Sequence, residues 1–293
     1  MNKKYMLIAA LAASTISLNA QTALYQFDFN DNNLGTTTAS TGSSTLTADM
    51  TYHSDTGDTA TNLRGADGSG VSGQAGDYAL DLTGATRMGG TSSVPGYGGV
   101  VYASSGSMNN ATSTTISMWY NASTEVGSFA RLFECGYTTI YALGTGEIRV
   151  AFRITDGVNQ SVDVSDAVLS LTNEWVFFAA TYDSATGTAK VYAGSKESGV
   201  LSEIASTTLD QGTIANSTGL AIGNNQRGSN ERPFQGLMDD VSVWVDESGS
   251  AGALSEAQLQ GVMSASIPEP SHAAALMCVV VGGMLLLRRR RRA

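Results

Sequence analysis

Three aspartates are the residues of this 293-residue chain whose types and positions best support a binding chemistry. Asp28 and Asp31 lie in the run FDFNDN near the amino-terminus, and Asp239 lies in the predicted strand 237–245. In a regular strand Asp239 shares its face with valines, where an ionised carboxylate is costly unless it is paired or binds a cation. Carboxylates are the hard oxygen ligands that calcium prefers, so the three acids predict a Ca²⁺ site. The alternative is that Asp239 pairs with an arginine or backbone amides, while Asp28 and Asp31 only cap a turn.

Catalytic groups are poorly represented. Between residues 21 and 270 the only histidine is His53, so Ser/His/Asp, Cys/His and zinc-dependent hydrolysis lack a base or ligands. Glycoside hydrolysis needs two carboxylates about 5–9.5 Å apart. Asp163 and Asp166 are three residues apart and Asp239 and Asp240 are adjacent, and both spacings place the side chains on opposite faces of a strand. The sequence therefore predicts no catalytic residues and a protein that is not an enzyme.

The charge of −10 is unevenly distributed along the chain. Lys3, Lys4 and the five arginines at 288–292 provide seven of the 16 basic residues. Residues 21–270 hold nine basic and 26 acidic groups, a net charge of −17. Such a body repels nucleic acid and anionic lipid, which excludes both as partners.

Both ends of the chain have the composition of export signals. Residues 1–20 combine a basic start, an apolar stretch and Ala20 at a plausible cleavage point, which predicts a signal peptide. At the other end Pro268, Glu269 and Pro270 precede an uncharged segment at 273–287 and the arginine run. As a helix this segment is about 22 Å long, short of a hydrocarbon core of about 30 Å, so it is better suited to a temporary stop than to a permanent anchor.

The three parts of the carboxyl-terminal segment, residues 266–293, resemble the PEP-CTERM sorting signal. The resemblance implies recognition of Pro268, Glu269 and Pro270 by an exosortase-type processing enzyme. It also implies transient membrane insertion through the helix at 273–287. The expected location is then the cell surface, outer envelope or extracellular matrix of a Gram-negative bacterium. The alternative is a plain tail anchor that follows a proline-rich kink.

In the body of the chain, residues 21–265, apolar and polar residues alternate along many short segments. This period of two is typical of antiparallel strands. Residues 174–182 are apolar on both faces, which predicts a central strand covered on both sides. The predicted strands are residues 24–29, 78–82, 114–120, 129–135, 139–143, 147–154, 174–182, 188–192, 220–222 and 237–245. This number of strands in one domain predicts an all-β fold, a two-sheet antiparallel β-sandwich or jelly roll.

Three further features complete the expected domain. Ser255, with Gln258 as its capping-box partner, predicts one short helix that runs to about Met263. The low-complexity segment 35–76 is rich in Thr, Ser, Gly, Ala and Asp, which predicts a surface excursion with little structure of its own. Cys135, the one cysteine of the body, is expected to be a small core residue.

Several motifs then resemble the LamG-like members of the concanavalin A-like lectin/glucanase superfamily. They are LYQFDFND (24–31), TTISMWYN (114–121), WVFFAATYDSATGTAKVYAG (175–194), GLMDDVSVWVD (236–246) and ALSEAQLQGVM (253–263). The resemblance spans roughly residues 24–263 and implies a β-sandwich jelly roll. It also implies that a calcium ion bridges the first strand region to Asp239. Members of the superfamily differ widely in function, so the resemblance indicates the fold more than the activity.

Three functions agree with these features. The first is a non-catalytic surface or extracellular module for adhesion, matrix or glycan binding. The second is a hydrolase or lyase of the same fold that acts on glycans, and the third is a purely structural envelope or biofilm component. Trp119 and Trp244 each share a strand face with polar residues and could form a sugar platform, but a neighbouring loop or sheet covers such tryptophans more often.

Overall fold

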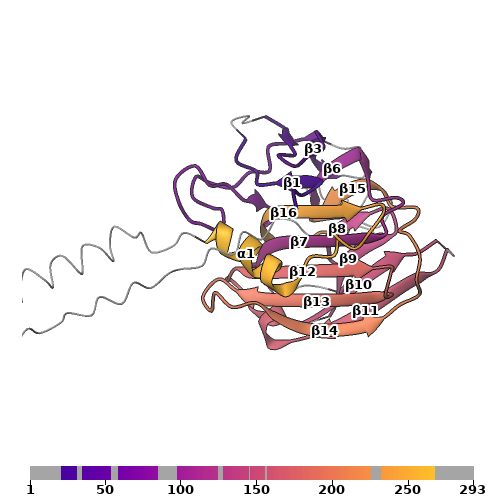
Figure 1. Cartoon of the computed structure of the whole chain (residues 1–293). Coiled ribbons are helices and arrows are strands. Elements are labelled where there is room, and N and C mark those ends of the chain that lie inside the picture. The colour runs from indigo at the N-terminus through magenta and orange to yellow at the C-terminus, as the bar shows by residue number, and fades with distance from the viewer. Residues whose placement is uncertain are drawn as a thin grey trace, which may run out of the picture.

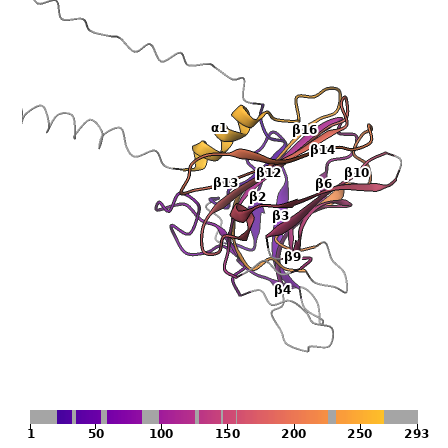
Figure 2. The ribbon, with the colours of Figure 1, turned by 90° about the horizontal axis from the view of Figure 1, so that it is seen from below.

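The computed structural model describes residues 21–31, 35–53, 59–84, 98–124, 128–144, 146–155, 157–225 and 232–267, which form two antiparallel sheets packed face to face (Figures 1 and 2). The predicted signal peptide at 1–20, the Pro268–Glu269–Pro270 motif and the apolar segment at 273–287 lie outside the described residues. In the described part of the chain, no helix is both long enough and apolar enough to cross a membrane.

The seven-stranded sheet has the order β1-β16-β7-β12-β13-β14, with the short β5 paired to β16. Its strands are β1 (Tyr25–Phe27), β5 (Leu80–Asp81), β7 (Ser113–Ala122), β12 (Val176–Asp183), β13 (Thr188–Ser195), β14 (Ser202–Thr208) and β16 (Gly236–Asp246). The predicted central strand is confirmed as β12, which lies between β7 and β13. Phe178 packs into the sandwich interior and Phe177 packs on the opposite face, so both faces of β12 are covered.

The nine-stranded sheet has the order β11-β10-β9-β8-β15-β6-β3-β2, with β4 paired to β3. Its strands are β2 (Thr37–Ala39), β3 (Thr47–His53), β4 (Thr59–Ala60), β6 (Gly98–Ser107), β8 (Arg131–Cys135), β9 (Thr138–Gly144), β10 (Glu147–Arg153), β11 (Asn159–Ser165) and β15 (Thr218–Ile222). A 3₁₀ turn, η1 (Ala167–Ser170), follows β11. The predicted two-sheet β-sandwich is confirmed.

The main core lies between the two sheets, where alternate residues of each strand meet. Met118 and Phe178 enter it from the seven-stranded sheet, and Phe133 and Phe152 enter it from the nine-stranded sheet. Cys135 is fully buried there, as predicted, and burial raises the pKa of its thiol to about 12. The thiol is therefore an inert packing group at neutral pH.

The prediction of a surface excursion over residues 35–76 is wrong. The segment supplies β2, β3 and β4, and residues 49–53 of β3 pair with β6. Ala48 and Met50 of β3 are completely buried, and Leu46 and Leu63 lie in the same core. The polar composition conceals the strand because the residues between the buried ones are Thr and Asp on the outward face.

The predicted helix is confirmed as α1 (Glu256–Ser266), which lies across the outer face of the seven-stranded sheet (Figure 1). The Ser255 side chain accepts a hydrogen bond from the Gln258 amide, and Gln258 completes the capping box. Leu259 and Met263 of the helix are fully buried, so α1 is held by its apolar face as well as by its cap.

Candidate functional site

Four aspartates, here called the carboxylate cluster, interact where the residues after β1, the loop 65–79 and β16 come together. They are Asp28, Asp77, Asp239 and Asp240. No basic side chain among the described residues forms an ion pair with any of them. Unneutralised carboxylates that face one another beneath a protein surface favour a proton or a cation.

Polar contacts hold these carboxylates in place. Asp239 is 1% exposed, and its two oxygens accept hydrogen bonds of 2.8 Å from the backbone amides of Val71 and Asp240. Asp77 accepts hydrogen bonds from the Ser72 amide at 2.8 Å and from the Asn30 side-chain amide at 3.2 Å. The loop and the segment after β1 are therefore tied to the carboxylates of the cluster.

Burial determines the electrostatics of the cluster. It raises the pKa of Asp239 well above the usual range for Asp, and repulsion from Asp240 and Asp77 raises the pKa further, against the two amide hydrogen bonds. Burial also raises the pKa of Asp240, together with the charges of Asp28 and Asp77, although a hydrogen bond with Ser266 opposes the shift. Folding therefore favours the protonated forms of both acids, or a bound cation that replaces the protons.

The backbone is unusual at the same place. Phe29 and Asp240 adopt left-handed conformations, with φ of 56° and 47°. The register between β16 and β7 shifts after Asp239, so Asp240 forms a bulge. Such conformations of non-glycine residues cost of the order of 1 kcal/mol and concentrate at functional sites.

The bulge corrects the expected orientation of Asp239. Its partner across the strands is Trp119, which packs on the outer face of the seven-stranded sheet, while Val241 points into the sandwich. Asp239 therefore does not share a face with the valines, because the additional residue at Asp240 reverses the alternation.

The structure gives the three predicted calcium ligands different surroundings. Asp28 and Asp239 belong to the carboxylate cluster, whereas Asp31 forms an ion pair with the buried Arg64. Asp28 also caps a turn by accepting a hydrogen bond from the Asn30 amide. Within the described residues, no three acidic, His or Cys side chains converge closely enough to hold a metal ion as they stand. The residues fit calcium in donor chemistry but need to draw together around the ion.

Sequence reasoning missed Asp77 and Asp240. Asp77 stands in a Gly-rich loop, where nothing in the sequence indicates its fold-back onto β16. Asp240 was considered only together with Asp239 as a catalytic pair, and a regular strand would have pointed it away. The left-handed φ of Asp240 is the missing information.

A second group of candidate side chains lies on the outer face of the nine-stranded sheet. This group, here called the Arg–aromatic surface, comprises Phe129, Arg131, Tyr137, Tyr141, Arg149, Arg153 and Arg232. Strand register forms part of it, since Tyr141 of β9 lies opposite Arg131 of β8 and Arg149 of β10. The outward positions of Arg149 and Arg153 follow from the alternation of residues 147–154, but the sequence does not indicate which aromatic residues lie beside them.

Guanidinium groups lie over the aromatic rings of this surface. The distance from the guanidinium carbon to the ring centroid is 4.1 Å for Arg131 over Tyr141, 4.8 Å for Arg153 over Tyr137 and 5.0 Å for Arg232 over Phe129. Tyr137 is nevertheless 54% exposed and Phe129 is 41% exposed. The surface thus presents flat apolar rings beside fixed positive charges.

Two of these arginines are also paired with acids. Arg131 lies 3.2 Å from Glu134, and Arg149 makes two 2.6 Å hydrogen bonds to Asp163. Among the described residues, Arg153 and Arg232 form no ion pair.

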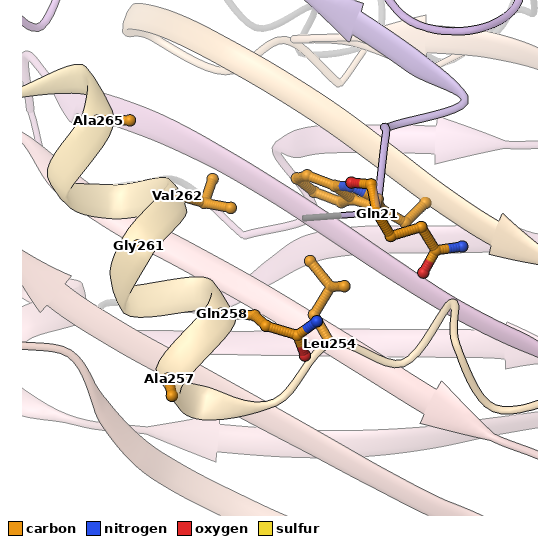
Figure 3. A pocket seen from close by; sticks show the side chains of 8 residues that line it. Gln21, Leu254, Ala257, Gln258, Gly261, Val262 and Ala265 are labelled. Atoms are coloured by element: carbon orange, nitrogen blue, oxygen red, sulfur yellow. The ribbon is translucent and has the colours of Figure 1, made fainter. Parts of the chain in front are cut away.

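An apolar pocket of 350 Å³ lies between α1 and the start of the described chain (Figure 3). Leu254, Ala257 and Val262 line it together with Trp244, whose indole N–H donates to the Gln21 carbonyl at 2.9 Å. Trp119 is fully buried nearby in the same outer cluster. Both tryptophans are buried, as expected, but they pack with the helix α1 rather than under a loop or sheet alone.

The fold and a sequence comparison agree on the class of protein. Residues 95–252 match the family model described as the concanavalin A-like lectin/glucanases superfamily, so the chain belongs to this superfamily. The resemblance found in the sequence motifs is thereby confirmed at the level of the superfamily. No curated protein matches the sequence significantly.

Solved structures with a similar architecture include proteins that bind carbohydrate and proteins that cleave it. The CBM40 of the Ruminococcus gnavus IT-sialidase, solved with alpha2,3 sialyllactose, has 18% identity and a TM-score of 0.41, and the match covers 54% of this chain and 84% of that one. A putative carbohydrate binding protein from Bacteroides ovatus has 26% identity and a TM-score of 0.40, over 51% of this chain and 40% of that one. An arabinofuranosidase complexed with arabinofuranosyl-alpha-1,2-xylobiose has 15% identity and a TM-score of 0.48, over 83% of this chain and 58% of that one. These likenesses are too distant to decide between binding and catalysis.

Proposed function

We propose that this chain is an exported, non-catalytic surface or extracellular module that binds glycans or an extracellular matrix protein. The observation that carries the proposal is the exposure of Tyr137 and Phe129 on the outer face of the nine-stranded sheet. Large aromatic side chains left open on a soluble domain mark contact surfaces more often than isolated small apolar residues do. The apolar faces of sugar rings can stack on such side chains, while Arg and Tyr donors bind the hydroxyl groups.

The test is a panel of immobilised polysaccharides and matrix proteins with Tyr137→Ala as the probe variant. Val200 is 60% exposed and lies outside the Arg–aromatic surface, so Val200→Ala is the matched control. We expect Tyr137→Ala to weaken glycan binding about fivefold, since one aromatic contact is worth about 1 kcal/mol. Binding to none of the panel by the unmodified protein would remove the proposal.

The second part of the proposal is that the carboxylate cluster holds Ca²⁺. Asp28, Asp77, Asp239 and Asp240 would supply hard oxygen ligands, and the ion would neutralise charges that burial otherwise disfavours. Asp31 would remain with Arg64. The ion would join β16 to the segment after β1, which is a structural role that needs no catalysis.

Melting with and without chelator tests the calcium site. We expect chelation to lower the melting temperature, Asp239→Ala to abolish the difference and Asp31→Asn to retain it. An unchanged melting temperature on chelation would exclude the metal. If chelation did not change the melting temperature of Asp31→Asn, Asp31 would be a calcium ligand after all.

Export and sorting are the third part. The helix at 273–287 would be inserted in the membrane transiently, and an exosortase-type enzyme would recognise Pro268, Glu269 and Pro270. The processed protein would then reach the cell surface, outer envelope or matrix of a Gram-negative bacterium. Replacing both prolines with alanine should cause the uncut chain to accumulate in the membrane fraction, and replacing Ser271 with alanine should not. Equal processing of the two variants would contradict the sorting proposal.

A glycan-active hydrolase or lyase, or a purely structural envelope component, is the alternative. The most perturbed acid, Asp239, is 1% exposed, which keeps it from a glycosidic oxygen. Incubation with the polysaccharides that bind, followed by a reducing-end assay, separates the alternatives. Release of sugar ends that is lost in Asp239→Asn or Asp240→Asn would establish catalysis.

A further inference from the structure

We infer that the ligand of the Arg–aromatic surface is an acidic polysaccharide, whose carboxylate or sulfate groups bind Arg153 and Arg232 beside the exposed rings. This inference rests on the proposed glycan-binding function and names the chemical class of the ligand.

Stacking fixes both guanidinium groups without using their N–H donors on an acid. Arg153 lies over the Tyr137 ring at 4.8 Å, and Arg232 lies over the Phe129 ring at 5.0 Å. One terminal nitrogen of Arg153 donates to the Asn159 side chain at 3.2 Å, and its Nε is buried without a hydrogen-bond partner among the described residues, which leaves the remaining terminal N–H groups for a ligand. A guanidinium held flat on a ring keeps its N–H edge directed away from the ring, as binding to a carboxylate or sulfate requires.

The charge distribution supports an acidic partner. The described residues hold seven basic side chains, and four of them belong to this surface, although residues 21–270 as a whole carry −17. Glu134 and Asp163 pair with Arg131 and Arg149, and Glu147 and Asp49 are further acids on outward positions of this sheet. Among the described residues, Arg153 and Arg232 are the two arginines of this surface that form no ion pair with an acid. An acidic chain that approaches elsewhere meets repulsion, which directs it to this face.

The two charges also have the spacing of an extended ligand rather than of a single ion. Arg153 is four residues from Arg149 along β10, or about 13 Å, and the ring pair Phe129 and Tyr141 lies at the Arg149 end of the surface. Arg232 stacks on Phe129 at that same end. A monosaccharide cannot bridge this distance, whereas a polysaccharide can place an acid group at each end and sugar rings between them.

The test compares matched acidic and neutral polysaccharides on the purified protein. Polygalacturonate is paired with its carboxyl-reduced form, and dextran sulfate is paired with dextran, so the arms also separate carboxylate from sulfate. We expect tight binding only to one or both acidic members and a steep loss of affinity with added salt. Arg153→Ala combined with Arg232→Ala should weaken that binding by a factor of ten or more, as expected for the loss of charge-assisted hydrogen bonds.

Lys196→Ala provides the control for loss of one positive charge elsewhere, and Arg153→Lys tests the fork geometry, since lysine retains the charge alone. Melting temperatures of all variants establish that they fold. Equal affinity for acidic and neutral members would overturn the inference and leave the glycan-binding function intact. Binding to neither would overturn the inference as well, and only failure on the wider panel of polysaccharides and matrix proteins would also remove the proposed function. Acidic binding that responds equally to the arginine variants and to Lys196→Ala, or self-association that the arginine variants abolish, would also overturn it.

Discussion

The two outer faces of the sandwich use the same residue types in opposite ways. On the seven-stranded sheet, which α1 crosses on its outer side (Figure 1), Trp119 and Phe177 pack edge to face at 5.3 Å in the same buried cluster as Leu259 and Met263 of α1. On the nine-stranded sheet, Tyr137 and Phe129 remain open and carry guanidinium groups instead of a helix. The difference means that an aromatic residue on an outer face of the sandwich is available for binding only where no other segment of the chain covers it.

The largest expected effect is a difference in stability between variants of the two outer faces. Trp119→Ala should lower the free energy of unfolding by about 3–5 kcal/mol, because it leaves a cavity under α1. Tyr137→Ala should change it by less than about 0.5 kcal/mol, because the side chain is exposed. Urea unfolding followed by circular dichroism measures both, and similar losses would contradict the distinction between a covered and an open face.

The next-largest effect concerns α1, which covers the outer face of the seven-stranded sheet. Leu259→Ala should cost about 2–5 kcal/mol, since Leu259 is fully buried between α1 and the sheet. Gly261→Ala should act in the opposite direction and stabilise by up to about 1 kcal/mol, because a Cβ added there meets no atom within 4 Å and alanine favours the helix. A destabilised Gly261→Ala protein would mean that the helix packs more tightly than the structure shows.

A smaller effect distinguishes the covered face by its pH dependence. The folded-state pKa values of Asp239 and Asp240 are raised, so the folded protein binds more protons than the unfolded chain above about pH 4. Without calcium, stability should therefore be greatest near that pH and fall as the pH rises towards the folded-state values. Asp239→Asn should flatten this slope, while Asp163→Asn on the open face should not. Thermal melts measured in chelator over a range of pH test this prediction. If the melting temperature of Asp239→Asn fell with pH as steeply as that of the unmodified protein, Asp239 would not be the cause of the pH dependence.

The smallest expected effect is at the helix cap. Ser255→Ala removes the hydrogen bond to the Gln258 amide and should cost about 1 kcal/mol. Ser255→Asp keeps an acceptor at the same place and should retain most of the stability. Equal melting temperatures for the alanine variant and the unmodified protein would show that packing alone holds α1.

The features that the sequence predicted well are those that depend on local pattern. The two-sided apolar run became β12, and Ser255 with Gln258 marked the start of α1, because alternation and capping act over a few residues. The orientation of Asp239 failed because one bulge residue, Asp240, reverses the alternation without a distinctive composition. The strand β3 was missed because threonines and an aspartate on its outward face conceal the buried Ala48 and Met50.

The candidate sites depended on contacts that no local pattern contains. Asp77 is 162 positions from Asp239, and Arg153 reaches Tyr137 only through the pairing of β10 with β9 and the turn that precedes β9. Individual residues of the sites can be placed on a face from alternation alone, which puts Arg149 and Arg153 on the same side of the strand 147–154. Their neighbours follow from sheet order and register, which are long-range properties of the fold.

The Ser266 hydrogen bond to Asp240 has a mechanical consequence. Ser266 is the last residue of α1, two positions before Pro268, so a pull on a surface-attached tail would reach the fold at this point. Force applied there would peel α1 from its end, and its contacts would break one after another instead of all at once. The hydrogen bond from Ser266 to Asp240 would be the first of these contacts to break. A cation bound by the carboxylate cluster would hold Asp240 more firmly and so raise the force at which an attached protein begins to unfold.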